Sequence, residues 1–560
     1  MTTPDTISVI CENTGLKHEV AIGTPLSELA ATLPAEKNRP LLAAFVNNRL
    51  KELSYRVYNP ISVRFVDITS FAGFRVYQRT VWFILQKAVH DLWPQNRLHI
   101  SHSLGQSGFY CEIEGMDPLT DEEVDRLMRR MRAIVEADYP ITRRKMLTAD
   151  VRRIYAEGGF DDKIALLDTR PRLYSVLYQL DDTVGYFYGS LAPSTGYVRF
   201  FDLERYFNGF YIALPLRTAP DEVHRRAEQE KMFDIFHDYK RWVEIMGVAT
   251  VGKINEQVLA GNTSELIRVA EAFHEKTLAG IADRIFEANV SHGTRLVLIS
   301  GPSSSGKTTS AKRLSIQLQV LGLNPVTISL DDYFVEREKT PRDEHGEYDY
   351  EALEAIDLEL FNDHLQRLFR GEEVRIPRYN FLTGGREWHE GALKLNERSI
   401  LIIEGIHGLN PRLTPGIPDE QKFKIYVSCF TSVSMDNLTR IATTDNRLLR
   451  RLTRDYTQRG NDARATISRW ASVRRGEEKH IFPYQENADV MFNSSLFYEI
   501  SVLRPLAEPI LREVPDTVPE YDEARRLLQF LDNFIPIYDT KDVPPTSVLR
   551  EFVGGSTFKY

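Results

Sequence analysis

Residues 298–314 read LISGPSSSGKTTSAKRL, and this stretch decides the fold of the C-terminal half. It follows a strand pattern, RLVLIS, and opens a helix pattern, TTSAKRLSIQLQVL, with the spacing G-x-x-x-x-G-K-[ST] between them. In such a loop, backbone N–H groups and the helix N-terminus converge on phosphates. Lys307 is expected to reach the β- and γ-phosphates, and Thr308 to bind Mg²⁺. The predicted phosphate loop consists of Gly301, Pro302, Ser303, Ser304, Ser305, Gly306, Lys307, Thr308 and Thr309.

Two later strand patterns end in acidic residues. NPVTISLDDYF ends in Asp331 and Asp332, and RSILIIEGIHGL places Glu404 at the end of an apolar run. Open parallel α/β sheets bind ligands beyond the carboxyl ends of their strands. A carboxylate at Asp331 is therefore placed to accept a proton from an attacking hydroxyl group and to contact the water shell of a metal ion. Glu404 is expected to be a second carboxylate that binds magnesium.

Arginines recur at helical spacing in DNRLLRRLTRDYTQRG. Arg447, Arg450, Arg451 and Arg454 stand at i, i+3, i+4 and i+7, so they share one face of the predicted helix. Four guanidinium groups on one face repel each other unless anions lie between them. We expect a lid that closes over the transferring phosphoryl group and excludes water. A solvated basic face is the alternative interpretation.

The length of 560 residues predicts several domains, because single hydrophobic cores stop growing well below this size. We expect an α/β fold in which a P-loop domain with a parallel sheet follows a β-grasp domain and an α+β domain. The predicted boundaries are 1–68 for the β-grasp domain, 69–230 for the α+β domain, 231–290 for a helical connector, 291–500 for the P-loop domain, and 501–560 for a partly helical tail.

Together, the motifs of residues 295–495 resemble the uridine kinase and phosphoribulokinase family. The resemblance is carried by GPSSSGKTT, LDDYF, EYDYEALEAIDLELF, IPRYNF, IIEGIHGL, RLLRRLTRDYTQRG and FPYQENADVMF. It implies an ATP- and Mg²⁺-dependent kinase that phosphorylates an alcohol group of a small molecule. It also implies roles for individual residues: Asp331 as catalytic base, Thr308 and Glu404 as magnesium ligands, Asp349 and Tyr379 at the acceptor, and Arg451, Arg454 and Arg459 in the lid.

Three positions depart from the family pattern where a pyrimidine would be recognised. Gly384 stands in place of a histidine, Asn461 in place of a lid arginine, and Arg469 in place of an acceptor-side glutamine. We therefore expect uridine and cytidine to be poor acceptors, and Arg469 to suit an acceptor that carries an anionic group. The alternative is that Arg386 or His389 supplies the missing contact and pyrimidine specificity survives.

The first half resembles the N-terminal region of threonyl-tRNA synthetases, a TGS domain followed by an editing domain. AAFVNNRLKEL, AVHDLWP, HSLGQSGFYCEIEG and LAPSTG carry this weaker similarity. The four positions that would bind zinc in the editing site hold Arg79, Phe83, Phe187 and Leu191. We expect neither editing activity nor a zinc site here.

The net and local charge indicate which partners the protein could bind. The net charge is -9, and residues 1–68 carry as many Lys and Arg as Asp and Glu, which does not support RNA binding. The rival hypothesis is a P-loop switch that binds RNA or the ribosome through the TGS-like domain. No stretch is apolar enough for a membrane span, so we expect a cytoplasmic protein. The sequence leaves the acceptor, the choice of ATP or GTP, and a homo-oligomer open.

Overall fold

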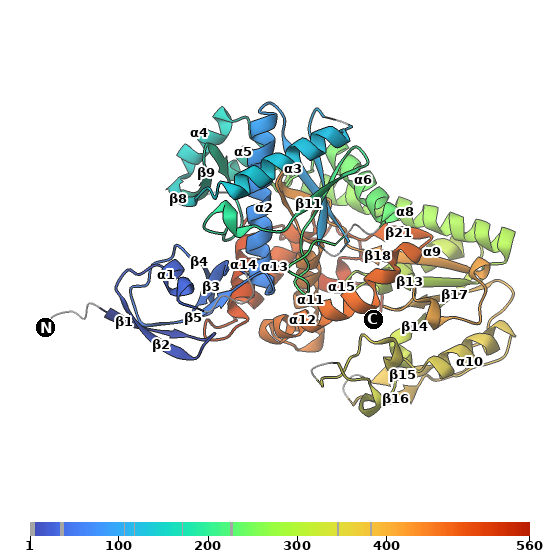
Figure 1. The fold of residues 1–560 in the computed structure, drawn as a ribbon. Helices are drawn as coiled ribbons and strands as arrows, with labels where there is room; N and C mark the ends of the chain where they lie inside the picture. Colours follow the sequence, from blue (N-terminus) through green and yellow to red (C-terminus); the bar gives the residue numbers. More distant parts are fainter. Residues whose placement is uncertain are drawn as a thin grey trace.

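The computed structural model describes residues 6–33, 39–105, 107–116, 118–170, 172–224, 228–343, 346–380 and 383–559. From the N-terminus the chain forms a small sheet, an α+β unit around a central helix, three connecting helices, a parallel α/β domain and a helical C-terminal segment (Figure 1). This arrangement confirms the predicted fold class, while the residue boundaries of the domains stay a prediction. Phe381, the last residue of the IPRYNF motif, lies outside the described residues.

The N-terminal sheet has the strand order β2-β1-β5-β3-β4, with β1 and β5 parallel and the other neighbours antiparallel. Val9, Val63 and Phe65 alternate inward and pack against Leu26 and Leu29 of the short helix. This is the order of a β-grasp sheet. Its elements are β1 (Thr6–Cys11), β2 (Leu16–Ala21), α1 (Leu26–Ala31), β3 (Ala43–Val46), β4 (Arg49–Glu52) and β5 (Ile61–Val66).

The α+β unit is built around α2 (Phe71–Leu92), which is buried from Val76 to Val89. Ser70 caps its N-terminus by accepting a hydrogen bond from the Gly73 backbone N–H at 3.0 Å. One sheet has the order β11-β12-β7-β6 and the other β10-β9-β8. The elements around α2 are β6 (Leu98–Leu104), β7 (Gly108–Ile113), α3 (Asp121–Glu136), β8 (Ile141–Leu147), α4 (Thr148–Glu157), α5 (Asp161–Asp168), β9 (Tyr174–Leu180), β10 (Thr183–Gly185), β11 (Asp202–Tyr206) and β12 (Gly209–Ala213).

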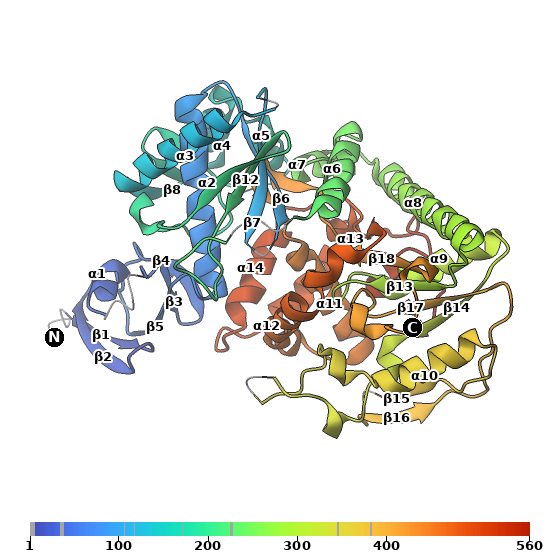
Figure 2. The same ribbon diagram turned by 45° about the vertical axis from the view of Figure 1, so that its right-hand side comes forward.

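A connector of α6 (Glu230–Ile245), α7 (Val251–Leu259) and α8 (Thr263–His292) joins this unit to the next domain. The long helix α8 runs along the parallel sheet (Figure 2). Leu278, Ile281 and Ile285 of α8 share a core with the sheet and the helix after the phosphate loop. The connector is therefore part of the α/β domain's packing rather than a free linker.

The parallel sheet has the order β14-β17-β13-β18-β21, and every neighbouring pair is parallel. Helices α8 and α9 cover one face, and α10 covers the other. Its elements are β13 (Leu296–Ser300), α9 (Lys307–Val320), β14 (Asn324–Ser329), α10 (Leu358–Phe369), β17 (Ser399–Glu404), β18 (Lys422–Ser428) and β21 (Val490–Asn493), with a hairpin of β15 (Pro377–Asn380) and β16 (Gly385–Trp388) beside it.

The remaining helices pack over the carboxyl edge of this sheet. The hairpin of β19 (Ser434–Asp436) and β20 (Thr439–Arg440) leads into α11 (Thr443–Arg459) and α12 (Ala463–His480), and the C-terminal segment adds α13 (Glu499–Arg512), α14 (Tyr521–Leu531) and α15 (Arg550–Val553). They share one hydrophobic core, which includes Leu448, Leu527 and Phe552. In the described ranges, no helix is long and apolar enough to cross a membrane.

Candidate active site

The phosphate loop joins the end of β13 to the start of α9, as predicted. Gly306 immediately precedes α9 with φ +84°, and Ser304 has φ +58°, a region that residues other than glycine rarely adopt. Lys307 Nζ donates to the Pro302 carbonyl at 3.2 Å, so the lysine folds back over the loop. A left-handed residue followed by helical backbone is the kind of turn that forms anion-binding loops at helix N-termini.

Sheet register brings the predicted metal ligands together. Glu404 lies opposite Ser329 of β14 and Ile299 of β13, so three strand ends meet at one edge. Its Oε1 accepts hydrogen bonds from Thr308 Oγ1 and Ser329 Oγ, both at 3.1 Å. Burial, followed by the nearby Asp331 carboxylate, raises the pKa of Glu404 to about 7.

The structure separates the roles of the two adjacent aspartates. Desolvation raises the pKa of Asp331, whereas the nearby cations Lys307, Arg459 and Arg454 of the phosphate loop and the lid helix act to lower it. Asp332 instead faces the β15–β16 hairpin, with its Oδ2 3.9 Å from His389 Nε2. Asp331 is therefore the better placed of the two to act on a group at the phosphate site.

Three predicted lid arginines converge on Asp455 within α11. Its carboxylate lies 3.2 Å from Arg451 Nε, 2.9 Å from Arg454 Nη2 and 3.7 Å from Arg459 Nε. Arg451 Nη1 also donates to the Ser303 hydroxyl of the phosphate loop at 2.9 Å. One carboxylate thus holds three guanidinium groups beside the loop.

The prediction of a single lid face is wrong for Arg447 and Arg450. Both are fully buried, Arg447 against Glu477 at 2.6 Å and Arg450 against Glu499 at 2.6 Å. The protein's own carboxylates, Glu477 and Glu499, thus supply the negative charge that balances these two arginines. Glu477 also accepts a hydrogen bond from the Ser303 backbone N–H at 3.2 Å, so the Arg447–Glu477 pair is connected to the phosphate loop.

Of the residues predicted for the acceptor, Tyr379 and Arg386 lie on the β15–β16 hairpin, and Asp349 lies in the segment before α10. Tyr379 and Arg386 face each other across the β15–β16 ladder, and Arg386 Nη2 pairs with Asp357 at 3.0 Å. Asp349 Oδ2 lies 3.6 Å from His480 Nε2. Arg469 is exposed on α12, and its role at the acceptor stays a prediction.

The backbone turn at Gly384 leaves no room for a side chain at that position. Gly384 has φ +73°, and a Cβ atom would lie 2.7 Å from Arg337 Nε. The Arg337 backbone N–H donates to the Gly384 carbonyl at 2.9 Å, which holds the arginine over the turn. Arg337 therefore fills the space in which a histidine would have to stand.

A half-buried carboxyl group that was not predicted from the sequence, that of Glu351, lies near Glu477 and the lid arginine Arg451. Burial, followed by the neighbouring Glu477, raises its pKa to about 7, while Arg451 and Lys307 act in the opposite direction. Its side chain packs against Gly476, where a Cβ atom would lie 2.5 Å away. Glu351 belongs to the quoted stretch EYDYEAL, but nothing in its spacing marks it as part of the phosphate site.

The C-terminal segment also reaches the loop, which the sequence did not indicate. Val548 Cγ2 lies 2.3 Å from where a Cβ atom of Gly306 would be, so only glycine fits there. Glu551 accepts a hydrogen bond from the Thr309 hydroxyl at 2.6 Å. The hydroxyl group of Thr309, a residue predicted to bind nucleotide, thus contacts the C-terminal segment.

Helix α14 connects the first half to the lid helix. Glu523 pairs with Arg75 of α2 at 2.7 Å and with Arg526 at 2.8 Å, and Arg526 pairs with Asp445 of α11 at 2.7 Å. The Leu50 backbone N–H of the β-grasp sheet donates to Asp522 at 2.8 Å. The N-terminal domains are therefore bound to the element that carries the lid arginines.

Protein side chains fill the place in the α+β unit that corresponds to the editing site. Phe83 and Phe187 stack in a tilted arrangement with ring centroids 5.2 Å apart, and Arg79 donates to the Ser190 carbonyl at 3.0 Å. His102 is buried, with Phe236 stacked on it at 4.5 Å. The described residues contain no group of three or more His, Cys, Asp or Glu that could hold a metal ion.

We expect the purified chain to contain no stoichiometric zinc and not to hydrolyse Ser-tRNA(Thr), because Arg79, Phe83, Phe187 and Leu191 occupy the ligand positions. Elemental analysis and a deacylation assay measure both. About one zinc per chain, which a site with three protein ligands would hold, would contradict the prediction.

The fold and the site together define a P-loop domain whose phosphate loop lies beside acidic residues at the strand ends. Residues 296–500 match the model of the Phosphoribulokinase / Uridine kinase family. A uridine kinase from Staphylococcus aureus is 28% identical over 199 residues, which are 35% of this chain and 86% of that kinase. The family match supports a phosphotransferase.

The N-terminal region matches a different set of proteins. A threonine–tRNA ligase from Symbiobacterium thermophilum is 31% identical over 190 residues, which are 34% of this chain and 29% of the ligase. The chain thus spans less than a third of the ligases that it matches.

Among solved structures, a D-glycerate 3-kinase from Cryptococcus neoformans aligns over 46% of this chain and 87% of the kinase chain, with 13% identity and a TM-score of 0.21.

Proposed function

We propose that the protein is an ATP- and Mg²⁺-dependent kinase that phosphorylates a hydroxyl group of a small molecule. The observation that carries this proposal is the place of Asp331: it follows β14, two residues after Ser329, whose hydroxyl donates to Glu404 beside the phosphate loop, and Lys307, Arg454 and Arg459 are its nearby cations. A carboxylate in that place can accept the proton of an attacking hydroxyl. A nucleotide switch has no need of such a base.

The residues present fit a magnesium ion and a nucleotide. Thr308, Ser329 and Glu404 gather their side-chain oxygens within hydrogen-bond distance, and hard cations bind oxygen ligands. Thr308, Asp331 and Glu404 are the residues that would hold the metal, which when bound neutralises charge on phosphate oxygens. Lys307 and the three arginines around Asp455 orient the phosphates and balance their charge.

Lys307→Ala is expected to abolish ATP turnover without unfolding the chain, because the lysine is only partly buried and its ammonium group donates to a carbonyl of the loop itself. Turnover is measured by ADP release in the presence of a metabolite mixture, and folding by thermal unfolding. Lys276→Ala, on the exposed side of α8, is the matched control and should leave turnover unchanged. Normal turnover by a folded Lys307→Ala variant would remove the phosphate loop from the proposal.

Uridine and cytidine are expected to be poor acceptors. A site that hydrogen-bonds a substrate group rejects analogues by up to about 10⁴-fold, whereas here Arg337 covers the turn and Gly384 offers no side chain. Steady-state kinetics with both nucleosides test this expectation. A kcat/KM for uridine in the usual range, above about 10⁴ M⁻¹s⁻¹, would contradict it.

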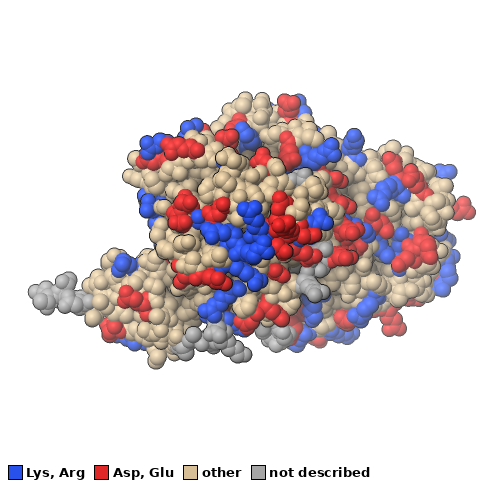
Figure 3. All heavy atoms as spheres, turned by 45° about the horizontal axis from the view of Figure 1, so that its top comes forward, with Lys and Arg blue, Asp and Glu red and all other residues tan. Residues whose placement is uncertain are grey.

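The rival, an RNA- or ribosome-binding switch, gains no support from surface charge. The basic cluster of α11 lies largely in ion pairs with Glu477, Glu499 and Asp455 rather than on the surface. On the face in Figure 3, a group of Lys and Arg side chains lies directly beside a group of Asp and Glu. Nucleic-acid affinity draws on a continuous basic surface.

A further inference from the structure

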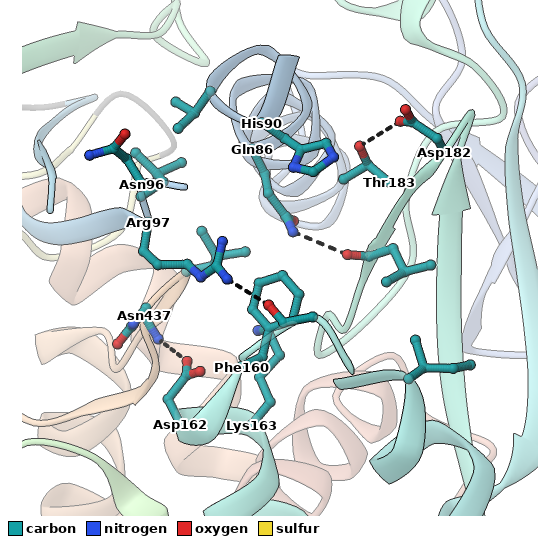
Figure 4. A pocket seen from close by; sticks show the side chains of 16 residues that line it. Gln86, His90, Asn96, Arg97, Phe160, Asp162, Lys163, Asp182, Thr183 and Asn437 are labelled. Atoms are coloured by element: carbon teal, nitrogen blue, oxygen red, sulfur yellow. Dashed lines mark hydrogen bonds between the residues drawn. The ribbon is translucent and has the colours of Figure 1, made fainter. Parts of the chain in front are cut away.

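A cavity of about 190 Å³ lies between the C-terminal part of α2 and the tip of the β19–β20 hairpin (Figure 4). The exposed residues His90 and Asp182 line one side of it. Protein interiors leave few voids larger than a water molecule, and a cavity of about 150 Å³ holds benzene. This cavity therefore has room for one small ring. Its apolar wall consists of Val89, Leu98, Ile154, Phe160, Val184 and Leu438.

Three of the charged side chains in the wall are engaged by the protein itself. Lys163 Nζ pairs with Asp436 at 3.1 Å, and Asp182 Oδ1 pairs with Lys87 at 2.8 Å. Asp162 Oδ2 accepts a hydrogen bond from the Asn437 backbone N–H at 2.8 Å. Each of these groups thus has a partner within the protein, although the buried Lys163 Nζ meets Asp436 without a hydrogen bond.

Arg97 differs from them. Its Nη2 donates to the Gly158 carbonyl at 2.6 Å, and its guanidinium group lies 4.9 Å from the centre of the Phe160 ring. In Figure 4 this group lies between Gln86 and Phe160. Within the described part of the chain, no carboxylate pairs with it. The cavity thus holds a positioned guanidinium group that lacks a counter-ion.

We propose that this cavity binds a small organic carboxylate with an apolar body, such as an aromatic acid. The planar guanidinium group of Arg97 matches a carboxylate, and its contacts to Gly158 and Phe160 hold it in place beforehand. The apolar wall removes the ring of the ligand from water. Because Asn437 and Leu438 form part of the wall, the ligand contacts both halves of the chain.

Calorimetry on the full chain tests the proposal with benzoate as the probe and benzamide as its neutral isostere. Benzoate is expected to bind with a Kd below about 1 mM, and benzamide at least about tenfold more weakly. Hydrogen exchange at the Leu438 amide, which donates to Asp436 Oδ1 at 2.9 Å, is expected to slow when benzoate binds. Equal binding of the two probes, or no benzoate binding, would overturn the proposal.

Two variants locate the binding. Arg97→Gln is expected to reduce benzoate affinity to that of benzamide, whereas Arg153→Gln on the exposed face of α4 should leave it unchanged. Val184→Phe fills the cavity and keeps Arg97, so it should weaken the binding of both benzoate and benzamide. This variant tests the site if the Arg97→Gln variant does not fold. Unchanged benzoate binding by folded Val184→Phe would place the ligand elsewhere and refute the site. None of these measurements depends on phosphoryl transfer.

Discussion

Asp331→Asn is expected to lower the rate of phosphoryl transfer by about 10²- to 10⁴-fold, the usual contribution of a general base. The amide has the size of the carboxylate but cannot take up the proton of the acceptor hydroxyl. Because Asp331 acts on the acceptor, ATP affinity should change much less than the rate. Single-turnover kinetics, together with titration of a fluorescent ATP analogue, separate the two effects.

Asp332→Asn is the matched control, because it makes the same chemical change one residue along. Asp332 faces His389 and the β15–β16 hairpin, so its loss should affect acceptor affinity more than the rate. A large loss of rate in Asp332→Asn, with near-normal transfer in Asp331→Asn, would reverse the assignment of the base.

Arg450→Ala is expected to destabilise the protein by about 3–5 kcal/mol, because it leaves the buried Glu499 carboxylate without its partner. The arginine also donates to the Ser494 carbonyl at 2.8 Å and lies 5.0 Å from the Phe552 ring, so several contacts are lost together. Urea unfolding followed by tryptophan fluorescence measures the change. The Arg450→Leu/Glu499→Leu double variant should recover most of the loss, since it removes both charges.

An exposed pair on a neighbouring helix provides the comparison. Arg512 pairs with Glu508 at 2.6 Å, but its side chain is 63% exposed, and such pairs contribute at most about 1 kcal/mol. Arg512→Ala should therefore shift the unfolding midpoint little. Equal losses of unfolding free energy in Arg450→Ala and Arg512→Ala would show that the buried pair stabilises the protein no more than the exposed pair.

Much of the site was predictable because local sequence dictates it. The loop from Gly301 to Thr308 needs its glycines and lysine at fixed spacing, and the strand before it forces it to the edge of the sheet. Asp331 and Glu404 were predictable for the same reason: each follows an apolar strand, and parallel strands end at one edge. The β-grasp sheet followed from short alternating strands separated by turns.

Helical periodicity was sufficient to place four arginines on one face but not to tell what lay opposite them. Arg447 and Arg450 meet Glu477 and Glu499, which lie 30 and 49 residues away along the chain. Spacing within a helix sets which residues share a face, whereas burial depends on the other helices.

By itself the sequence determined the phosphate loop, the acidic strand ends and the replaced editing ligands, because each depends on residues adjacent in the chain or on one strand register. Only the tertiary structure decided that Glu351 and Glu551 belong to the site, and that α14 joins the first half to the lid helix. Glu551 meets Thr309 across 242 residues of chain. No local preference encodes such a contact, because it arises from the way separate hydrophobic cores pack together.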